Sequence, residues 1–277
     1  MDPRLQLRVQ RYGWDKAEPL YERFWAAQLE PAQRRLLALA NLRPGDRILD
    51  VAAGTGLVTF PAAEAVGPGG QVTATDLSEA MVESLRTGAV ARGLANVTAL
   101  RMDGESLDFP SASFDAALCA LGLMYFPDPR RSLAGIRRVL QPGGRAVAAV
   151  WGARRHCGWA EIFPIVEARV ASEVCPLFFQ LGTGDALAAG FEAAGFRDLT
   201  VERLTTVLRY DSAEDACGAA FAGGPVALAY SRFDETTRAA AHRDYLDSIA
   251  EYRRGTGYDI PGEFVIVAGR APAGQEG

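Results

Sequence analysis

The sequence predicts an α/β protein built on a seven-stranded, mostly parallel, doubly wound sheet. Two observations predict this class. Short apolar runs alternate with longer amphipathic segments from residue 46 to residue 151. Turns rich in glycine and proline, at 67–70 and 141–144, separate the helical segments from the strands that follow them. Regular alternation of strand and helix is typical of parallel sheets covered by helices on both faces.

Each element follows from its local sequence. The expected strands cover 47–52, 71–76, 97–102, 114–120, 145–151, 197–209 and 263–269. The expected helices cover 14–41, 55–66, 79–92, 129–140 and 184–194, with a further helical segment over about 212–254. Pro19 and Pro31 mark helix starts or breaks in the first of these. Ser78 caps the helix after the second strand and Gly93 ends it. We expect the tail from residue 272 to be disordered.

These elements divide the chain into three parts. Residues 1–45 form an N-terminal helical lid, 46–151 a ligand-binding core, and 152–277 the rest of the sheet with helical cap insertions at about 152–183 and 212–258. Ligands of such sheets bind outside the carboxyl ends of the strands. The insertion after the fifth strand leaves from that edge. The helical parts therefore either enclose a substrate or simply cover the sheet, and both can hold.

Composition narrows the function classes. The chain of 277 residues has a net charge of −5 and no block of Lys or Arg, which disfavours nucleic acid as a partner. Its four cysteines, Cys119, Cys157, Cys175 and Cys217, are widely spaced, which predicts neither a zinc site nor a disulfide framework. Two distant histidines and scattered acids predict no metal site. Without a signal peptide or a long apolar run, we expect a cytoplasmic protein that does not contact membranes.

The most informative stretch is the turn after the first strand. Asp50 is followed by small residues at Ala52, Gly54 and Gly56, and Asp76 ends the second strand twenty positions after Gly56. Small residues let the backbone approach a ligand closely. A carboxylate at the tip of the second strand is placed to accept hydrogen bonds from both hydroxyls of a ribose. The pair predicts a cofactor that contains adenosine.

A nicotinamide dinucleotide fits this turn poorly. The third glycine of its fingerprint is replaced by Thr59, and that glycine allows the helix to pack tightly beneath a pyrophosphate. Asp50 would repel a pyrophosphate but not a cation. A nicotinamide-dependent dehydrogenase is therefore the disfavoured alternative.

The core resembles the class I S-adenosylmethionine (SAM) methyltransferases, in the group that includes ubiquinone/menaquinone-biosynthesis C-methyltransferases and many small-molecule methyltransferases. Five blocks carry the resemblance in order: DVAAGTG at 50–56, TDLSEAM at 75–81, MDGESLDFP at 102–110, FD at 114–115 and LQPGGR at 140–145. The first departs from the family motif because Ala52 stands in place of a glycine. The match covers residues 46–151 and weakens beyond Trp151.

The resemblance implies a Rossmann-like fold and a set of cofactor contacts. Ala52, Gly54 and Gly56 would line the methionine part, with Asp50 beneath its amino group and the Ala120 carbonyl near the ammonium. Asp76 would bind the ribose. The adenine would be bordered by Leu77 and Met81, and Asp103 with Gly104 would face its amino group. The alternatives are that Leu77 and Met81 belong to the core and that Asp103 is a turn residue.

Methyl transfer from a sulfonium needs alignment, the exclusion of water and, for a hydroxyl or amine acceptor, a general base. His156, just after the fifth strand, and Tyr125, just after the fourth, are the candidates. Tyr12, Trp14 and Trp151 are expected on the lid and substrate side, since an aromatic face attracts a cation. A solvated loop histidine and aromatic residues that only pack are the alternatives.

Together these observations predict a monomeric or homodimeric enzyme that transfers a methyl group from SAM to a small apolar or aromatic metabolite. The other product is S-adenosylhomocysteine (SAH). One alternative is a quinone-precursor C-methyltransferase. Another is a protein of the same fold that binds SAM without methyl transfer, as a scaffold or as a catalyst of a different reaction.

Overall fold

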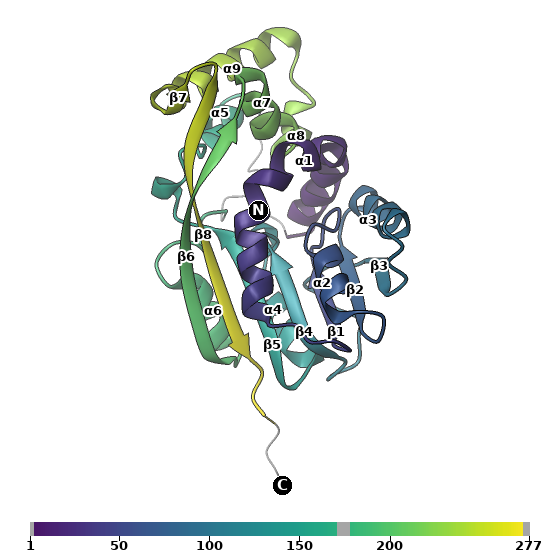
Figure 1. Ribbon diagram of the computed structural model, residues 1–277. Coiled ribbons are helices and arrows are strands. Elements are labelled where there is room, and N and C mark those ends of the chain that lie inside the picture. The colour runs from purple at the N-terminus through teal and green to yellow at the C-terminus, as the bar shows by residue number, and fades with distance from the viewer. Residues whose placement is uncertain (1–2, 171–177, 274–277) are drawn as a thin grey trace.

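The computed structural model describes residues 3–170 and 178–273. Its described strands form one sheet in the order β3-β2-β1-β4-β5-β8-β6, with β7 paired to β8 outside this path (Figure 1). The strands are β1 (Arg47–Val51), β2 (Gln71–Asp76), β3 (Val97–Arg101), β4 (Phe114–Ala120), β5 (Leu140–Trp151), β6 (Arg197–Tyr210), β7 (Arg253–Arg254) and β8 (Gly257–Arg270). Strands β1 to β5 are parallel, whereas β8 runs antiparallel between β5 and β6. The mostly parallel, doubly wound sheet expected from the sequence is confirmed.

Helices cover both faces of this sheet. The longer ones are α1 (Pro3–Ala40), α2 (Thr59–Val66), α3 (Glu79–Ala91), α4 (Pro129–Val139), α6 (Ala186–Ala193) and α9 (Glu235–Ser248), and the shorter ones are α5 (Ile162–Glu167), α7 (Ala213–Cys217) and α8 (Ala227–Tyr230). Leu36 of α1 and Val66 of α2 pack with Ile48 of β1 on one face. Ile136 of α4 and Phe191 of α6 belong to the core on the other. Alternate strand residues face these two cores, as the pleat requires.

The first helix differs from the sequence expectation. It runs unbroken from Pro3 to Ala40, so Pro19 and Pro31 neither start nor break it. An internal proline costs roughly 3 kcal/mol because it removes a helical hydrogen bond. Burial of neighbouring side chains offsets this cost, since Ala17 before Pro19 and Leu29 and Ala32 on either side of Pro31 are fully or nearly fully buried. Tertiary packing therefore overrides the local signal.

Two other boundaries shift for identifiable reasons. Helix α2 begins at Thr59 rather than 55, because 53–58 form a turn in which Gly54 and Gly56 have positive φ. Strand β5 begins at Leu140 and not at 145. The turn at 141–144 becomes an irregularity where the pairing shifts from Phe114–Leu140 to Ala116–Arg145. Glycines in the adjoining turns move both boundaries. Those at 54 and 56 delay the start of α2, and those at 143 and 144 let β5 continue through an irregularity in the pairing.

The last strand is longer than expected. Strand β8 begins at Gly257 instead of 263, and residues 253–258 form a tight hairpin of β7, a turn at 255–256 and the start of β8 rather than part of a helix. It pairs with β6 as far as Tyr210–Tyr258, and the two strands form a ribbon that rises past the sheet to α7 and α9 (Figure 1). Residues 274–277 of the expected disordered tail lie outside the described residues.

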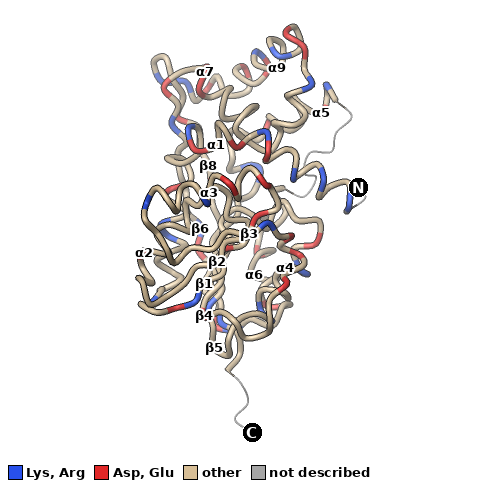
Figure 2. Tube along the Cα trace, turned by 90° about the vertical axis from the view of Figure 1, so that its right-hand side faces the viewer, with Lys and Arg blue, Asp and Glu red and all other residues tan. Residues whose placement is uncertain are grey.

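Charged residues are spread along the chain. Figure 2 shows Lys and Arg interspersed with Asp and Glu on most elements. No helix in the described ranges is long and apolar enough to cross a membrane.

Candidate active site

A cavity opens at the carboxyl ends of β2, β1, β4 and β5, the edge at which parallel sheets bind ligands. It has about 960 Å³ of empty space, part of it open to solvent. Neighbouring strands lie about 4.8 Å apart, so the cavity floor spans roughly 14 Å from β2 to β5. The residues expected from the sequence that line it are Trp14, Ala52, Gly54, Asp76, Leu77, Met81, Asp103, Gly104, Ala120, Tyr125 and Trp151. Residues from α1, from α3 and from the ends of strands β1 to β5 thus meet in one place.

The turn after β1 adopts a conformation that favours glycine. Ala52 has a φ of +56° and Gly54 a φ of +58°, both in the left-handed region. For alanine this region costs about 1–2 kcal/mol. The methyl group of Ala52 fits because residue 122 is glycine, where an added Cβ would stand only 2.5 Å from the Ala52 Cβ. The substituted motif is therefore accommodated by a second small residue, after β4.

Gly56 is required by the packing of the turn. It is not among the described residues that line the cavity. Its φ is +101°, and a Cβ there would stand 2.6 Å from the Phe60 ring. Glycine at this position lets the turn pack onto the first residues of α2.

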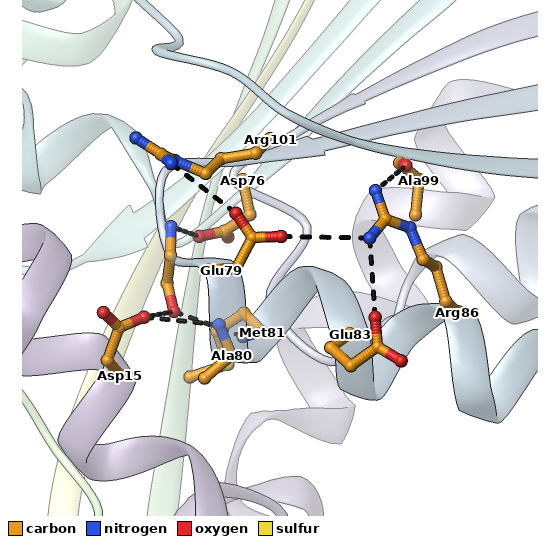
Figure 3. A network of polar contacts seen from close by, with 10 residues as sticks. Asp15, Asp76, Glu79, Ala80, Met81, Glu83, Arg86, Ala99 and Arg101 are labelled. Atoms are coloured by element: carbon orange, nitrogen blue, oxygen red, sulfur yellow. Dashed lines mark hydrogen bonds and ion pairs between the residues drawn. The ribbon is translucent and has the colours of Figure 1, made fainter.

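Asp76 at the tip of β2 is held by backbone donors. Its Oδ2 accepts a hydrogen bond of 2.9 Å from the Gly54 amide, and its Oδ1 accepts one of 2.9 Å from the Ser78 amide. Burial raises the pKa of this carboxyl above its ordinary value, although these hydrogen bonds oppose the shift. The Ser78 hydroxyl in turn donates to Asp15 of α1 at 2.6 Å (Figure 3). The carboxylate is thus fixed in orientation at the cavity wall.

Asp50 lies beneath the turn and does not itself line the cavity. It is 1% exposed. Its Oδ2 accepts a hydrogen bond of 2.6 Å from the Thr59 hydroxyl, while its Oδ1 has no partner among the described residues. Burial raises its pKa to about 7, and the charge of Asp76 adds to the shift. One oxygen of this buried carboxyl therefore lacks the hydrogen bond that buried polar atoms normally have.

Asp103 and Gly104 form the wall beside β3. The Asp103 Oδ1 accepts a hydrogen bond of 2.9 Å from the Glu105 amide. A Cβ at Gly104 would stand 2.6 Å from the Phe126 ring. Glycine therefore lets Phe126 approach, and both residues line the cavity.

Aromatic rings surround the side of the cavity near β5. All four tryptophans of the chain, Trp14, Trp25, Trp151 and Trp159, line it. The rings of Trp151 and Trp159 lie 5.0 Å apart between centroids, and those of Trp14 and Tyr125 lie 5.1 Å apart. Edge-to-face pairs of this kind hold one another in place. This side of the cavity is therefore apolar and preorganised.

Several lining residues were not expected from the sequence. They include Tyr21, Trp25, Leu29, Met124, Trp159 and Phe178. The helical period gives a signal for those on α1, since Trp14, Tyr21 and Trp25 are spaced by seven and four residues and share one face. Trp159 and Phe178 follow β5 in a segment without a regular period, so only the fold places them.

His156 and Tyr12 lie outside the described cavity lining. The His156 Nδ1 is 3.0 Å from the Glu263 Oε2, which also accepts a hydrogen bond of 2.9 Å from Arg203. Tyr12 is 50% exposed, and the Arg11 guanidinium stands over its ring at 5.3 Å. Neither side chain therefore lies among the described residues that line the cavity, where both were expected from the sequence.

Comparison with known proteins agrees with this geometry. Residues 48–144 match the family model described as a methyltransferase domain. The chain is 30% identical over 282 residues to the nocamycin O-methyltransferase of Saccharothrix syringae, covering 94% of this chain and 98% of that protein. It is 42% identical over 110 residues to the ubiquinone/menaquinone biosynthesis C-methyltransferase of Teredinibacter turnerae, covering 39% of this chain and 44% of the relative.

Solved structures show the same fold. One is phosphoethanolamine N-methyltransferase 2 of Haemonchus contortus in complex with S-adenosyl-L-methionine, with a TM-score of 0.61 and 18% identity over 93% of this chain and 57% of that one. Another is the [4+2]-cyclase SpnF, with a TM-score of 0.57 and 25% identity over 88% of this chain and 82% of that one. Fold, cavity and full-length similarity together establish that the chain belongs to the SAM-dependent methyltransferases.

Proposed function

We propose that the enzyme transfers the methyl group of SAM to a small apolar or aromatic metabolite bound against the tryptophans. One observation carries this proposal: a single cavity joins two unlike surfaces. On the side of β2 it presents Asp76, Asp103 and the Gly54 turn. On the side of β5 it presents Trp25, Trp151, Trp159 and Phe178. A polar cofactor and an apolar acceptor can therefore lie end to end.

The polar side fits SAM. Asp76 would accept hydrogen bonds from the ribose, the small residues Ala52 and Gly54 would let the methionine part approach the backbone, and Asp103 would face the adenine. The unpartnered Asp50 Oδ1 lies behind this turn and suits the ammonium group. SAM, when bound, supplies a methyl group already activated on a sulfonium.

The protein's own contribution is alignment and the exclusion of water. Tyr21 of α1 lies over the Gly54 turn, where a Cβ added to Gly54 would stand 3.8 Å from the edge of the Tyr21 ring. Burial, reinforced by the charge of Asp76, raises the pKa of its phenol, so Tyr21 stays protonated at neutral pH. Tyr125 lines the cavity after β4 and remains the candidate that would contact the acceptor.

Two other functions rest on specific similarities. The match to a quinone-biosynthesis C-methyltransferase supports methylation of a quinone precursor, but it covers only 39% of this chain. A match of that length cannot contain both the core and the long helical insertion between β6 and β8. The similarity to the cyclase SpnF supports a protein of this fold that catalyses a reaction other than methyl transfer.

The three functions are separated by following SAM and SAH. The enzyme is incubated with SAM and a library of aromatic metabolites, and SAH is measured together with the mass of each acceptor. A gain of one methyl group on an aromatic acceptor, matched by SAH, supports the proposal. Turnover confined to prenylated quinone precursors supports the first alternative. Conversion of an acceptor without SAH formation supports the second.

A further inference from the structure

We propose that the methyl acceptor is an oxygen acid, ionised before it binds, whose oxygens accept hydrogen bonds from the indole N–H groups of Trp25 and Trp159. This inference rests on the proposed function and names the substrate class. It starts from two donors of the cavity wall that the cofactor does not use.

The two indoles are buried and unpaired. Trp25 is 6% exposed and Trp159 is 4% exposed, and both line the cavity. Neither Nε1 has a hydrogen-bond partner among the described residues. Their ring centroids are 6.1 Å apart, and both rings contact Trp151. Two neighbouring indoles at the apolar end of the site thus each carry an unpaired donor.

Unpaired buried donors are rare because each has lost its hydrogen bond to water without gaining another. A ligand that supplies an acceptor recovers that loss. The Trp25 Nε1 lies beside Gly224, itself a lining residue, where an added Cβ would stand 3.6 Å from the nitrogen. Both nitrogens are closed to solvent in this structure, so an acceptor oxygen reaches them by displacing neighbouring side chains.

The chemistry of indole selects the ligand. An indole N–H donates a hydrogen bond and cannot accept one. A hydroxyl or amine acceptor has to lose a proton, and these two groups cannot take it. An ionised oxygen acid needs only donors. A hydrogen bond to a charged oxygen is also stronger than one to a neutral oxygen.

Once the cofactor is bound, the charges around the cavity favour an anionic acceptor at the aromatic end, next to Trp25 and Trp159. The carboxylates of the lining, Asp76 and Asp103, belong to the cofactor side. An oxyanion beside a sulfonium forms a pair of opposite charges, which a low-dielectric wall of aromatic rings strengthens. In the transfer, an oxygen lone pair forms the bond to the methyl carbon, the carbon–sulfur bond breaks with its electrons left on sulfur, and no proton moves. Both charges disappear, so an apolar site favours the transition state over the charged reactants.

Four tryptophans in the chain make a direct binding test possible. Protein labelled with ¹⁵N-tryptophan is saturated with SAH, which cannot transfer a methyl group, and is then titrated with 1-naphthoate or 2,4-dinitro-1-naphthol. The four indole N–H resonances are assigned with single Trp→Phe variants. The expected result is a downfield proton shift of the Trp25 and Trp159 signals, larger than that of Trp14. If neither signal moves in protein that binds SAH, the inference is wrong.

A second test compares acceptors of one shape with SAM present. The acceptors are 1-naphthoate, 2,4-dinitro-1-naphthol, 1-naphthalenemethanol and 1-naphthylamine, and SAH is measured. Turnover of the naphthoate identifies a carboxylic acid as the source of the oxyanion, and turnover of the nitronaphthol an acidic phenol. Preference for the alcohol or the amine contradicts the inference but leaves the proposed methyltransferase intact. Failure of SAH to bind at all contradicts the proposed function instead.

Variants compare the two assigned donors with a third indole of the same cluster. Trp25→Phe and Trp159→Phe each remove one of the two unpaired N–H groups, and Trp151→Phe makes the same change at the ring that stacks on Phe264. The expected result is a rise in KM for the turned-over acid of about tenfold or more for each of the first two. Trp151→Phe measures the effect of exchanging an indole for a phenyl ring at a lining residue to which the inference assigns no hydrogen bond, and a rise equal to those of the other two contradicts the inference. SAH binding, followed by calorimetry, checks that each variant is folded.

Discussion

The Ser78 hydroxyl donates a hydrogen bond of 2.6 Å to Asp15, and the same residue's amide donates one of 2.9 Å to Asp76. One serine therefore connects the N-terminal helix to the carboxylate expected to bind ribose (Figure 3). Asp15 also accepts from the Ala80 amide at 3.3 Å, at the first turn of α3. The position of α1 and the shape of the cofactor side are thus linked.

Asp15→Ala removes this link. We expect the dissociation constant of SAH to rise about tenfold, since a hydrogen bond to a charged group is worth about 1.5–3 kcal/mol. Calorimetric titration with SAH measures it. Glu30→Ala is the matched control, because Glu30 lies on the same helix and pairs only with Arg34 at 3.5 Å on an exposed surface among the described residues. Equal weakening in both variants would show that α1 acts through general stability alone.

Ala52 and Gly122 are expected to be coupled. Gly122→Ala should lower the free energy of unfolding by a few kcal/mol, because its Cβ would stand 2.5 Å from the Ala52 Cβ and 3.0 Å from the Cys119 sulfur. Ala52→Gly relieves the left-handed strain and opens space for that methyl group. The double variant should therefore recover part of the loss. Urea denaturation of all four proteins measures the coupling, and strictly additive effects would contradict the close contact.

Asp50 is expected to give the free enzyme a pH-dependent stability. Its pKa is raised to about 7 in the folded protein, chiefly by burial, against about 4 in the unfolded chain. The folded state then binds more protons between these values, so stability falls as pH rises from about 4 to 7. The slope for one proton is at most about 1.4 kcal/mol per pH unit. Asp50→Asn should remove this part of the slope in melting curves without ligand, and an unchanged slope would show that the burial does not act on this group.

His156 should not be needed for turnover. It pairs with Glu263 outside the described cavity lining, so His156→Gln is expected to change kcat by less than about twofold and to lower the melting temperature slightly. Tyr125→Phe, made at a lining residue, is the comparison. A loss of kcat in His156→Gln that exceeds the loss in Tyr125→Phe would contradict this prediction and show that His156 takes part in turnover.

The sequence alone predicts most of the sheet and most of the residues that line the polar side of the cavity, because both depend on local signals. Asp76 and Gly54 are tied to the ends of apolar strands, and parallel strands bring such ends together. The acceptor side depends on contacts that no local pattern contains. Trp25 lines the cavity because α1 continues as one helix despite its two prolines. Trp159 lines it because of the path that the segment after β5 takes.

The misplaced residues show the same limit. His156 lies close in sequence to the end of β5, yet Glu263 of the antiparallel strand β8 holds it elsewhere. Gly56 belongs to the motif but is required by the Phe60 ring. A residue that is close to a motif in sequence can still point away from the site, because contacts with neighbouring strands determine the direction of its side chain.

The most direct test is the melting temperature of the wild type and Asp76→Asn with SAM, SAH or NAD. Asn keeps the size of the side chain while removing the charge. A ligand at a hundred times its Kd stabilises a protein by about 2.7 kcal/mol. We predict a clear rise with SAM and SAH, no rise with NAD, and loss of most of the rise in Asp76→Asn. A rise with NAD alone, or an Asp76→Asn protein that responds to SAH like the wild type, would contradict the cofactor site assigned to this cavity.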